Sequence, residues 1–191
     1  MLFQFKIKKI ILSCVFMVSF QNAYAESLKD LHTVWLTTES KETTAVSAAA
    51  DSYALVAMVY TGCAHACPLT IAKIQSILKD FEKNKMTNMK VVLASFDVKN
   101  DRPDKLKSYQ LDKKLSFEQW KFLSAVNDDS ARELSVVLGI SYKDLGDGDF
   151  SHSNVITLIS PQGEILSSIN NLNSGSEALI SAYQKHSKQK R

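Results

Sequence analysis

Two cysteines and a histidine in the stretch TGCAHACPLT, residues 61–70, have the residue types and spacing to do chemistry. Cys63 and Cys67 are separated by three residues, with His65 between them and Pro68 directly after them. Two thiols at this spacing can close a disulfide, exchange electrons with a substrate disulfide, or bind a soft metal ion. The motif alone leaves all three uses open.

The number of available ligands narrows the choice of metal. Structural zinc sites take four protein ligands, and this stretch offers only two cysteines. Two thiolates and one imidazole in a three-ligand site suit soft Cu(I) instead. His65 cannot easily point at the same atom as both flanking sulfurs, so we expect it to be exposed and to tune the thiolate pKa. His32 and His186 lie near the chain ends, where we expect solvated side chains.

His152 is the remaining candidate for the third ligand. It lies in GDGDFSHSNVITLIS, at the end of a Gly- and Asp-rich loop and just before a predicted strand. We expect this loop to close over the face where the first long helix begins. A plain surface-loop histidine is the competing interpretation, and position alone does not decide between them.

Hydrophobic patterns predict the elements that must place these residues. A nearly continuous apolar strand precedes the cysteines, and Ile71, Ile74, Leu78 and Phe81 form one helical stripe after them. The predicted elements are a hairpin over 33–47, strands over 53–60, 89–97 and 120–125, helices over 68–83, 103–111, 127–140 and 174–186, and two strands within 154–169.

This order predicts an α/β protein of thioredoxin-like type, a three-layer α/β/α domain with a mixed sheet and an N-terminal β-hairpin. The cysteines fall at a turn from a strand to a helix, where open α/β sheets gather ligands and chemistry. We expect Cys67 at the N-terminus of the helix, where the helix dipole lowers the pKa of a thiol.

The N-terminus predicts export. Three lysines precede an apolar run over 10–20, and Ala23 and Ala25 form a small-residue cleavage signal, so we expect residues 1–25 to be a signal peptide. The run is shorter than the ~20 residues that span a bilayer, although an uncleaved N-terminal anchor is the alternative. A soluble periplasmic domain over 26–185 and a basic tail over 186–191 would remain.

Cleavage would also change the cysteine count and the charge. Cys14 would leave with the peptide, so Cys63 and Cys67 would be the two cysteines of the mature chain, a usual sign of a disulfide in an exported protein. The three lysines of the peptide account for the formal net charge of +3, so the rest of the chain is neutral. A neutral chain gives no electrostatic support for a nucleic-acid partner, whereas the basic tail could touch a membrane surface.

Three segments in the same order resemble the SCO/SenC family of copper-binding, thioredoxin-like proteins. VYTGCAHACPLT resembles its strand and C-x3-C-P motif. SFDVKNDRPDKLKSY, with Asp97, Asp101 and Pro103, resembles its Asp-x3-Asp-x-Pro segment. DFSHSNVITLISPQGEI resembles its His-bearing loop, strand and Pro-x-Gly turn. The resemblance covers roughly residues 34–183.

The resemblance implies that Cys63, Cys67 and His152 bind one copper ion, Cu(I) or Cu(II), and that Asp97 is an acid near the site that orients or tunes a ligand. A strand-end aspartate that makes a turn is the alternative for Asp97. The familiar family loop is Cys-Pro-x-x-Cys-Pro with an acid before the second cysteine. This chain lacks that first proline and that acid and adds His65. Losing the negative charge should lower the affinity for Cu(II) relative to Cu(I).

Two functions therefore stand first. One is a periplasmic metallochaperone, not strictly an enzyme, which assists assembly of a copper centre of the cytochrome c oxidase type. Its partners would be a copper-receiving protein such as an oxidase subunit and a thiol reductant, and we expect it to be a monomer. The other is a thiol-disulfide oxidoreductase or redox sensor that uses a Cys63–Cys67 disulfide. A peroxidase-like activity and a purely structural disulfide are further alternatives.

Overall fold

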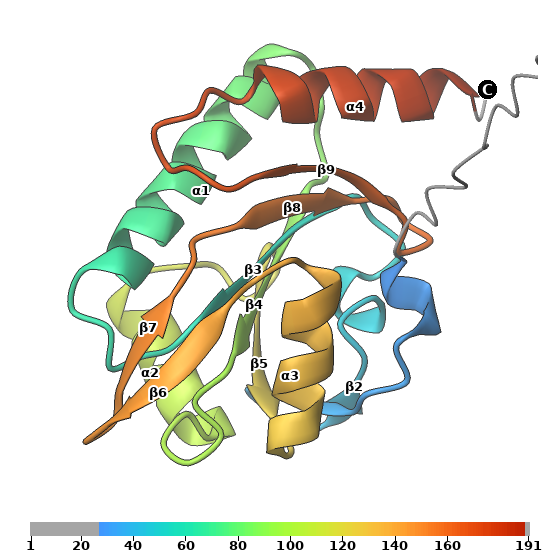
Figure 1. The fold of residues 1–191 in the computed structure, drawn as a ribbon. Helices are drawn as coiled ribbons and strands as arrows, with labels where there is room; N and C mark the ends of the chain where they lie inside the picture. Colours follow the sequence, from blue (N-terminus) through green and yellow to red (C-terminus); the bar gives the residue numbers. More distant parts are fainter. Residues whose placement is uncertain (1–26, 190–191) are drawn as a thin grey trace, which may run out of the picture.

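A seven-stranded mixed sheet forms the centre of the molecule in the computed structural model, which describes residues 27–189 (Figure 1). The predicted signal peptide lies outside the described residues. The strands of this sheet, in the order in which they pair, are β2 (Glu42–Thr43), β1 (Trp35–Thr37), β5 (Trp120–Ala125), β4 (Lys90–Ser95), β3 (Ala54–Val59), β8 (Ile156–Ile159) and β9 (Ile165–Ile169). Strands β3, β4 and β5 are parallel, whereas β1, β8 and β9 pair antiparallel with their neighbours.

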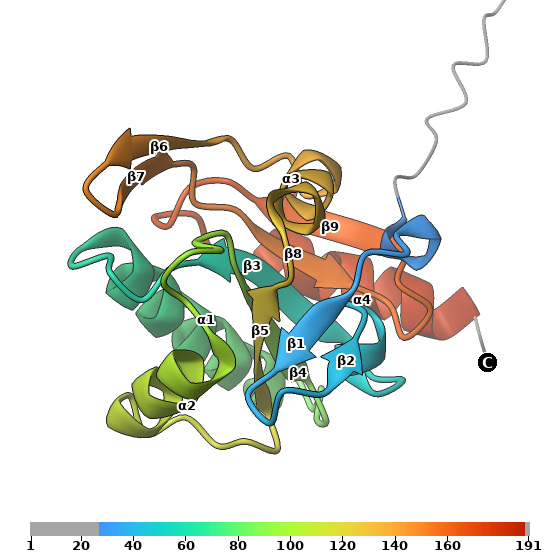
Figure 2. The ribbon, with the colours of Figure 1, turned by 90° about the horizontal axis from the view of Figure 1, so that it is seen from below.

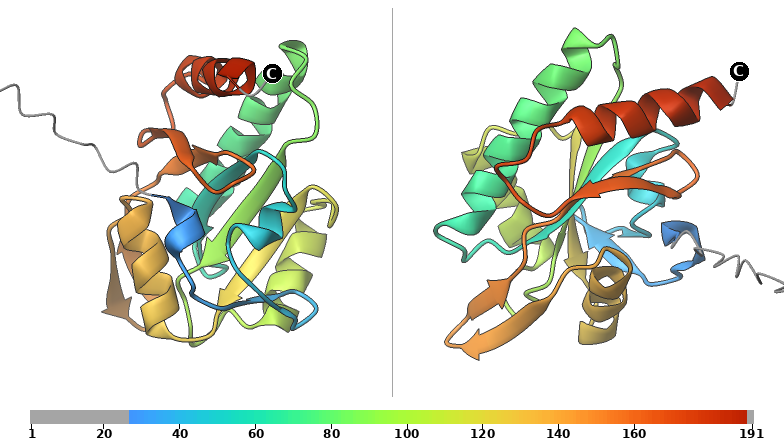
Figure 3. Two further views of the ribbon diagram at one scale, coloured as in Figure 1. Left: turned by 90° about the vertical axis from the view of Figure 1, so that its right-hand side faces the viewer. Right: turned by 45° about the horizontal axis from the view of Figure 1, so that its top comes forward.

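Helices cover both faces of this sheet. The four helices of the described part of the chain are α1 (Ala66–Lys83), α2 (Pro103–Asp112), α3 (Asp128–Val137) and α4 (Glu177–Gln189), with short 3-10 turns at Leu28–Asp30 and Ser47–Ala49. Helices α1 and α2 lie on one face and α3 on the other (Figure 3). Helix α4 packs beside β9 and meets α1, where the rings of Phe81 and Tyr183 lie 6.3 Å apart. The predicted three-layer thioredoxin-like fold is confirmed.

The elements around the cysteines follow directly from their sequences. All six residues of β3 are buried, as its continuous apolar run predicts for a central strand. Helix α1 buries the predicted stripe, and Phe81 at its far end is fully buried. The helix begins at Ala66, two residues earlier than predicted, so Pro68 is its third residue rather than its first. Pro68 still costs no hydrogen bond there, because the first four N–H groups of a helix have no intrahelical acceptor.

The N-terminal hairpin is confirmed, although its strands are short. Trp35 pairs with Thr43 across the turn, and Ser40 in the turn has a positive φ of 60°. Strand β1 also pairs with β5, which places this hairpin at one edge of the sheet. Both tryptophans, Trp35 and Trp120, are buried in the core.

A second hairpin stands where the sequence predicted a loop. Strands β6 (Tyr142–Gly146) and β7 (Asp149–His152) pair with each other as a separate two-stranded sheet. Three successive residues with positive φ make the turn between them, Gly146, Asp147 and Gly148. Figure 2 shows the hairpin projecting beside the first turn of α1. The loop prediction for this segment was therefore wrong.

The C-terminal segment is more ordered than expected. Helix α4 continues through Gln189, so residues 186–189 of the predicted basic tail are helical. The His186 side chain is largely buried, with Nδ1 2.8 Å from the hydroxyl of Tyr53 and Nε2 3.2 Å from Oε2 of Glu164. The expectation of a solvated His186 was therefore wrong, because this histidine anchors the last helix to the start of β3 and to the β8–β9 turn. No helix within residues 27–189 combines the length and apolar character needed to cross a bilayer.

Candidate metal centre

The two cysteines lie where β3 gives way to α1. Cys63 is in the connecting loop and half-buried, whereas Cys67 is the second residue of α1 and fully buried. The backbone N–H of Cys67 donates to the Cys63 sulfur at 3.3 Å, and the N–H of Tyr60 lies 3.5 Å from the Cys67 sulfur. Each sulfur thus faces a backbone donor at the C-terminal end of a central strand.

A buried aspartate from the neighbouring loop holds the start of this turn in place. Asp101 is fully buried and accepts a hydrogen bond from the backbone N–H of Thr61 at 2.7 Å and another from the Thr61 hydroxyl. The hydroxyl of Ser95, at the end of β4, donates to the same carboxylate at 2.7 Å. Asp101 therefore ties the cysteine loop to the end of the adjacent strand.

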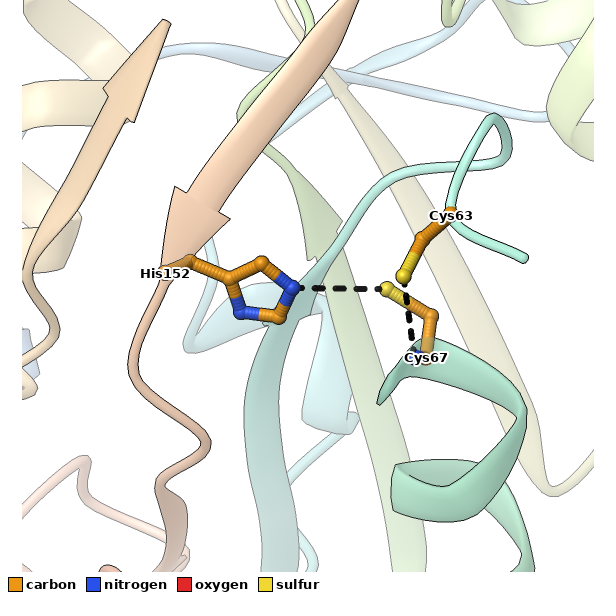
Figure 4. Close-up of side chains that lie close together, drawn as sticks. All are labelled: Cys63, Cys67 and His152. Carbon is orange, nitrogen blue, oxygen red and sulfur yellow. Dashed lines mark hydrogen bonds between the residues drawn. The ribbon is translucent and has the colours of Figure 1, made fainter. Parts of the chain in front are cut away.

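His152 approaches the cysteines from the end of β7. Its Nε2 lies 3.9 Å from the Cys67 sulfur, and Figure 4 shows the ring directed at the two sulfurs. Its Nδ1 lies 3.2 Å from the carbonyl oxygen of Ser153. With the ring proton on Nδ1, donated to that carbonyl, the Nε2 lone pair is free to bind a metal, whereas a proton on Nε2 is donated to a thiolate when no metal is bound.

The ligand atoms of Cys63, Cys67 and His152 all lie within 4.8 Å of one another. Nitrogen and sulfur ligands about 2.0–2.3 Å from one ion would lie about 3.5–4.0 Å apart in a trigonal arrangement. The separation of 3.9 Å between Nε2 and the Cys67 sulfur fits that arrangement. A pocket of about 490 Å³, lined in part by Cys63, His65 and His152, leads to the cluster.

The three residues singled out from the sequence thus meet at one point, on the elements of a thioredoxin-like fold. The model of the SCO1/SenC family matches residues 31–187, which is most of the chain. The chain belongs to the SCO1/SenC family.

Individual relatives agree with this assignment. The SCO1 protein homolog of Bacillus subtilis (strain 168) is 25% identical over 118 residues, which cover 61% of this chain and 61% of that protein. Among solved structures, Arabidopsis thaliana ScoI with copper bound has a TM-score of 0.69 at 17% identity and covers 82% of this chain and 96% of that one. BsSco, a member of the Sco family of cytochrome c oxidase assembly proteins, has a TM-score of 0.67 at 22% identity, with 81% and 91% covered. The matched region spans only about three fifths of the curated relative.

Within this SCO1/SenC site the two thiols differ sharply in acidity. Burial disfavours the Cys63 thiolate, but the backbone N–H of Cys67, the His152 ring and the backbone N–H of His65 outweigh it and lower the Cys63 pKa to about 6. Burial raises the pKa of Cys67 well above its ordinary value, and the charge of the Cys63 thiolate raises it further. We had expected the helix N-terminus to lower the pKa of Cys67. That expectation was wrong, because Cys67 is buried and the N–H of its own first turn points at Cys63.

Asp97 is not part of the group of ligand atoms that lie within 4.8 Å of one another. Its carboxylate accepts from the backbone N–H of Asn100 at 3.0 Å and from the Asn100 side-chain amide at 2.9 and 3.1 Å. This is the strand-end turn that the sequence left as the alternative for Asp97. The acid that touches the cysteine loop is Asp101, to which the sequence analysis gave no role. Its place in the Asp-x3-Asp-x-Pro segment was the available signal.

The other histidines stay outside the cluster. His65 directly precedes α1 and is exposed, as expected, and it contributes its backbone N–H to the environment of Cys63. His32 is exposed as well. His152 is therefore the one histidine of the described residues in the cluster. His186 differs from the expectation only in being largely buried rather than solvated.

Proposed function

We propose that this chain is an exported copper-binding metallochaperone that holds one copper ion through Cys63, Cys67 and His152 and passes it to a copper-receiving protein. The observation that carries the proposal is the convergence of two sulfurs and one imidazole nitrogen within 4.8 Å. Thiolate and imidazole ligands suit Cu(I), and imidazole suits Cu(II) as well. Copper is the cargo here rather than a resident catalytic group.

The position of the site supports ligand exchange with a partner. Cys63 and His152 line the same open pocket, so an incoming thiol or imidazole could reach the ion from the solvent side while Cys67 stays buried behind it. The copper-receiving centre of a cytochrome c oxidase subunit is the acceptor that we propose, because family relatives include oxidase assembly proteins such as BsSco. The signal-peptide pattern over residues 1–25 supports a periplasmic location.

A second candidate function rests on the difference in acidity between the thiols. The half-buried Cys63 thiolate, with a pKa of about 6, could attack a disulfide of the target and release one target thiolate. Cys67, after losing its proton, would then attack the Cys63 sulfur. That step would leave a Cys63–Cys67 disulfide, release the second target thiolate and move two electrons to the target. A thiol reductant would restore the pair.

A transfer assay separates these two functions. The reduced protein, loaded anaerobically with one Cu(I), would be mixed with the copper-free soluble domain of an oxidase subunit, with Cu(I)-glutathione as the control donor. We expect copper to reach the acceptor faster from the protein than from glutathione. In parallel, the copper-free reduced protein would be mixed with the oxidised acceptor, and thiols counted on each partner. Thiol exchange without copper transfer would support the oxidoreductase. If neither copper transfer nor thiol exchange occurs, both proposed functions are contradicted.

Export has its own test. The full-length chain, expressed in a bacterium with a periplasm, would be fractionated and its N-terminus sequenced. We expect the periplasmic protein to begin at Glu26. A membrane-bound protein that retains residues 1–25 would establish the anchor instead.

A further inference from the structure

The third ligand stands on an element that the central sheet does not hold. Within residues 27–189, β6 and β7 form main-chain ladders only with each other. Side chains fasten this hairpin to the body of the protein. The rings of Phe96 and Tyr142 stack at 5.0 Å, and the exposed ion pair between Lys99 and Asp144 spans 3.6 Å. The position of His152 relative to the sulfurs therefore depends on side-chain contacts.

Tyr60 makes a polar contact between the hairpin and the body of the protein. It follows β3 directly and is 2% exposed. Its hydroxyl donates to Oδ1 of Asp149 at 2.6 Å and lies 3.4 Å from the backbone N–H of Phe150. Both partners belong to β7, where Asp149 lies three residues and Phe150 two residues before His152. The hydroxyl thus fastens the strand that carries the third ligand.

The same residue contacts both cysteines through its backbone. Its N–H faces the Cys67 sulfur at 3.5 Å, and its carbonyl accepts from the backbone N–H of Cys63 at 3.3 Å. Its ring also meets the His152 ring edge-on, with centroids 6.0 Å apart. A Cβ on Gly62 would approach the Tyr60 ring to 3.3 Å, so the cysteine loop lies directly against that ring. One residue therefore touches every part of the cluster.

We propose that Tyr60 is a positioning residue whose hydroxyl joins the His152 hairpin to the cysteine loop and so sets how strongly the imidazole contributes to copper binding. This inference rests on the proposed copper function and deepens it. Two thiolates are enough to bind Cu(I) tightly, whereas the binding of Cu(II) depends more on the imidazole. Loss of the hydroxyl should therefore weaken Cu(II) binding more than Cu(I) binding, and so raise the preference of the site for Cu(I).

Tyr60→Phe is the informative variant, because it removes the hydroxyl and keeps the ring. Tyr142→Phe is the matched control. Tyr142 lies in the hairpin that carries His152 and packs against Phe96, as Tyr60 does. Its hydroxyl makes no hydrogen bond within the described part of the chain. Cu(I) and Cu(II) affinities would be measured anaerobically by chelator competition on the reduced proteins. For Tyr60→Phe we expect about a tenfold or greater loss for Cu(II) and a smaller loss for Cu(I).

A double variant tests whether the effect acts through the histidine. If Tyr60 works by placing His152, Tyr60→Phe should change copper affinity little in a His152→Ala background, because coupled residues are not additive. A full additional loss in that background would show that the hydroxyl acts elsewhere, and would overturn the proposal.

A measurement without metal keeps this proposal separate from the copper function. Amide hydrogen exchange of residues 149–152 in the reduced, copper-free protein should be about tenfold faster in Tyr60→Phe and unchanged in Tyr142→Phe. Unchanged exchange in Tyr60→Phe would overturn the positioning role whether or not copper binds. Faster exchange with an unchanged ratio of Cu(I) to Cu(II) affinity would overturn it as well. Failure of the wild-type protein to bind copper would instead refute the proposed function.

Discussion

Cys63 and Cys67 belong to the body of the molecule, whereas His152 belongs to a hairpin that, within residues 27–189, pairs with no strand of the central sheet. The cysteine side is built from β3 and α1, both lined with buried apolar residues, and the buried Asp101 fixes the loop between them. The histidine side is a two-stranded ribbon in which most of β6 is exposed. Packing alone therefore makes the cysteine side the more rigid of the two.

This contrast suggests a division of labour within the site. The cysteine side supplies both sulfurs at fixed positions, so it should determine whether a soft ion binds at all. The histidine side packs on the core through Tyr142 and Phe150 but does not pair with the central sheet, so it should tune affinity and release. In the proposed copper transfer, a removable third ligand would lower the barrier to ligand exchange. The predictions below test this division.

Loss of either cysteine should have the largest effect. Cys63→Ser and Cys67→Ser each replace a soft sulfur with a hard oxygen, and we expect Cu(I) affinity to fall well beyond the ~100-fold typical of losing a supporting residue. Chelator competition under anaerobic conditions measures the fall. Cys67 is buried, so urea unfolding of both variants serves as the control for stability. Tight Cu(I) binding in either variant would contradict the role of the cysteine side.

The two thiols should also differ strongly in reactivity. The rate of Cys63 alkylation should rise as pH rises toward about 6, where half of it is thiolate, and level off above that value. Cys67 should react at least ~100-fold more slowly in the folded protein, because it is buried and must wait for local opening. Mass spectrometry of iodoacetamide-treated, copper-free protein at several pH values follows both residues. Faster labelling at Cys67 would reverse the assignment of the nucleophile.

Removal of the imidazole should lower the Cu(I) affinity less than removal of a sulfur does. In His152→Ala the two thiolates remain, so we expect Cu(I) affinity to fall by about 10- to 100-fold with one copper still bound per chain. His65→Ala is the matched control, because His65 lines the same pocket without joining the cluster. An equal loss in both variants would remove the distinction between the two histidines.

Substitution of Asp101 or Asp97 should have the smallest effect on Cu(I) affinity. Asp101→Asn loosens the hold on Thr61 and should weaken Cu(I) binding by up to about tenfold, as for residues that support a ligand-bearing loop. Asp97→Asn should have less effect, because Asp97 is bonded to Asn100 rather than to the cysteine loop. The same competition assay ranks the two. A larger loss in Asp97→Asn would restore Asp97 as the acid that tunes a ligand.

The sequence predicted the cysteine side better than the histidine side, for a physical reason. A buried strand such as β3 and a helical stripe such as that of α1 leave periodic apolar patterns that survive without tertiary information. Strands β6 and β7 leave little such pattern, since Asp144, Asp147 and Asp149 and two glycines dominate them and the turn between them. The hairpin is placed on the body of the protein by aromatic contacts of Tyr142 and Phe150 with Phe96 and Tyr60, which come from elsewhere in the chain.

The acidities of the thiols could not be predicted from local position. A cysteine in the first turn of a helix ordinarily has a lowered pKa, but Cys67 is fully buried and burial dominates. The hydrogen bonds that lower the Cys63 pKa come partly from His152, which lies far along the chain. The anchoring of His186 by Tyr53 and Glu164 is another long-range contact that sequence separation conceals.

X-ray absorption spectroscopy of the reduced protein loaded with one Cu(I) tests the central claim most directly. Our account predicts that copper is bound by two sulfurs and one nitrogen, and that the nitrogen contribution disappears in His152→Ala while both sulfurs remain. Copper bound by sulfur alone in the wild-type protein, or an unchanged spectrum in His152→Ala, would contradict the claim that the hairpin supplies the third ligand.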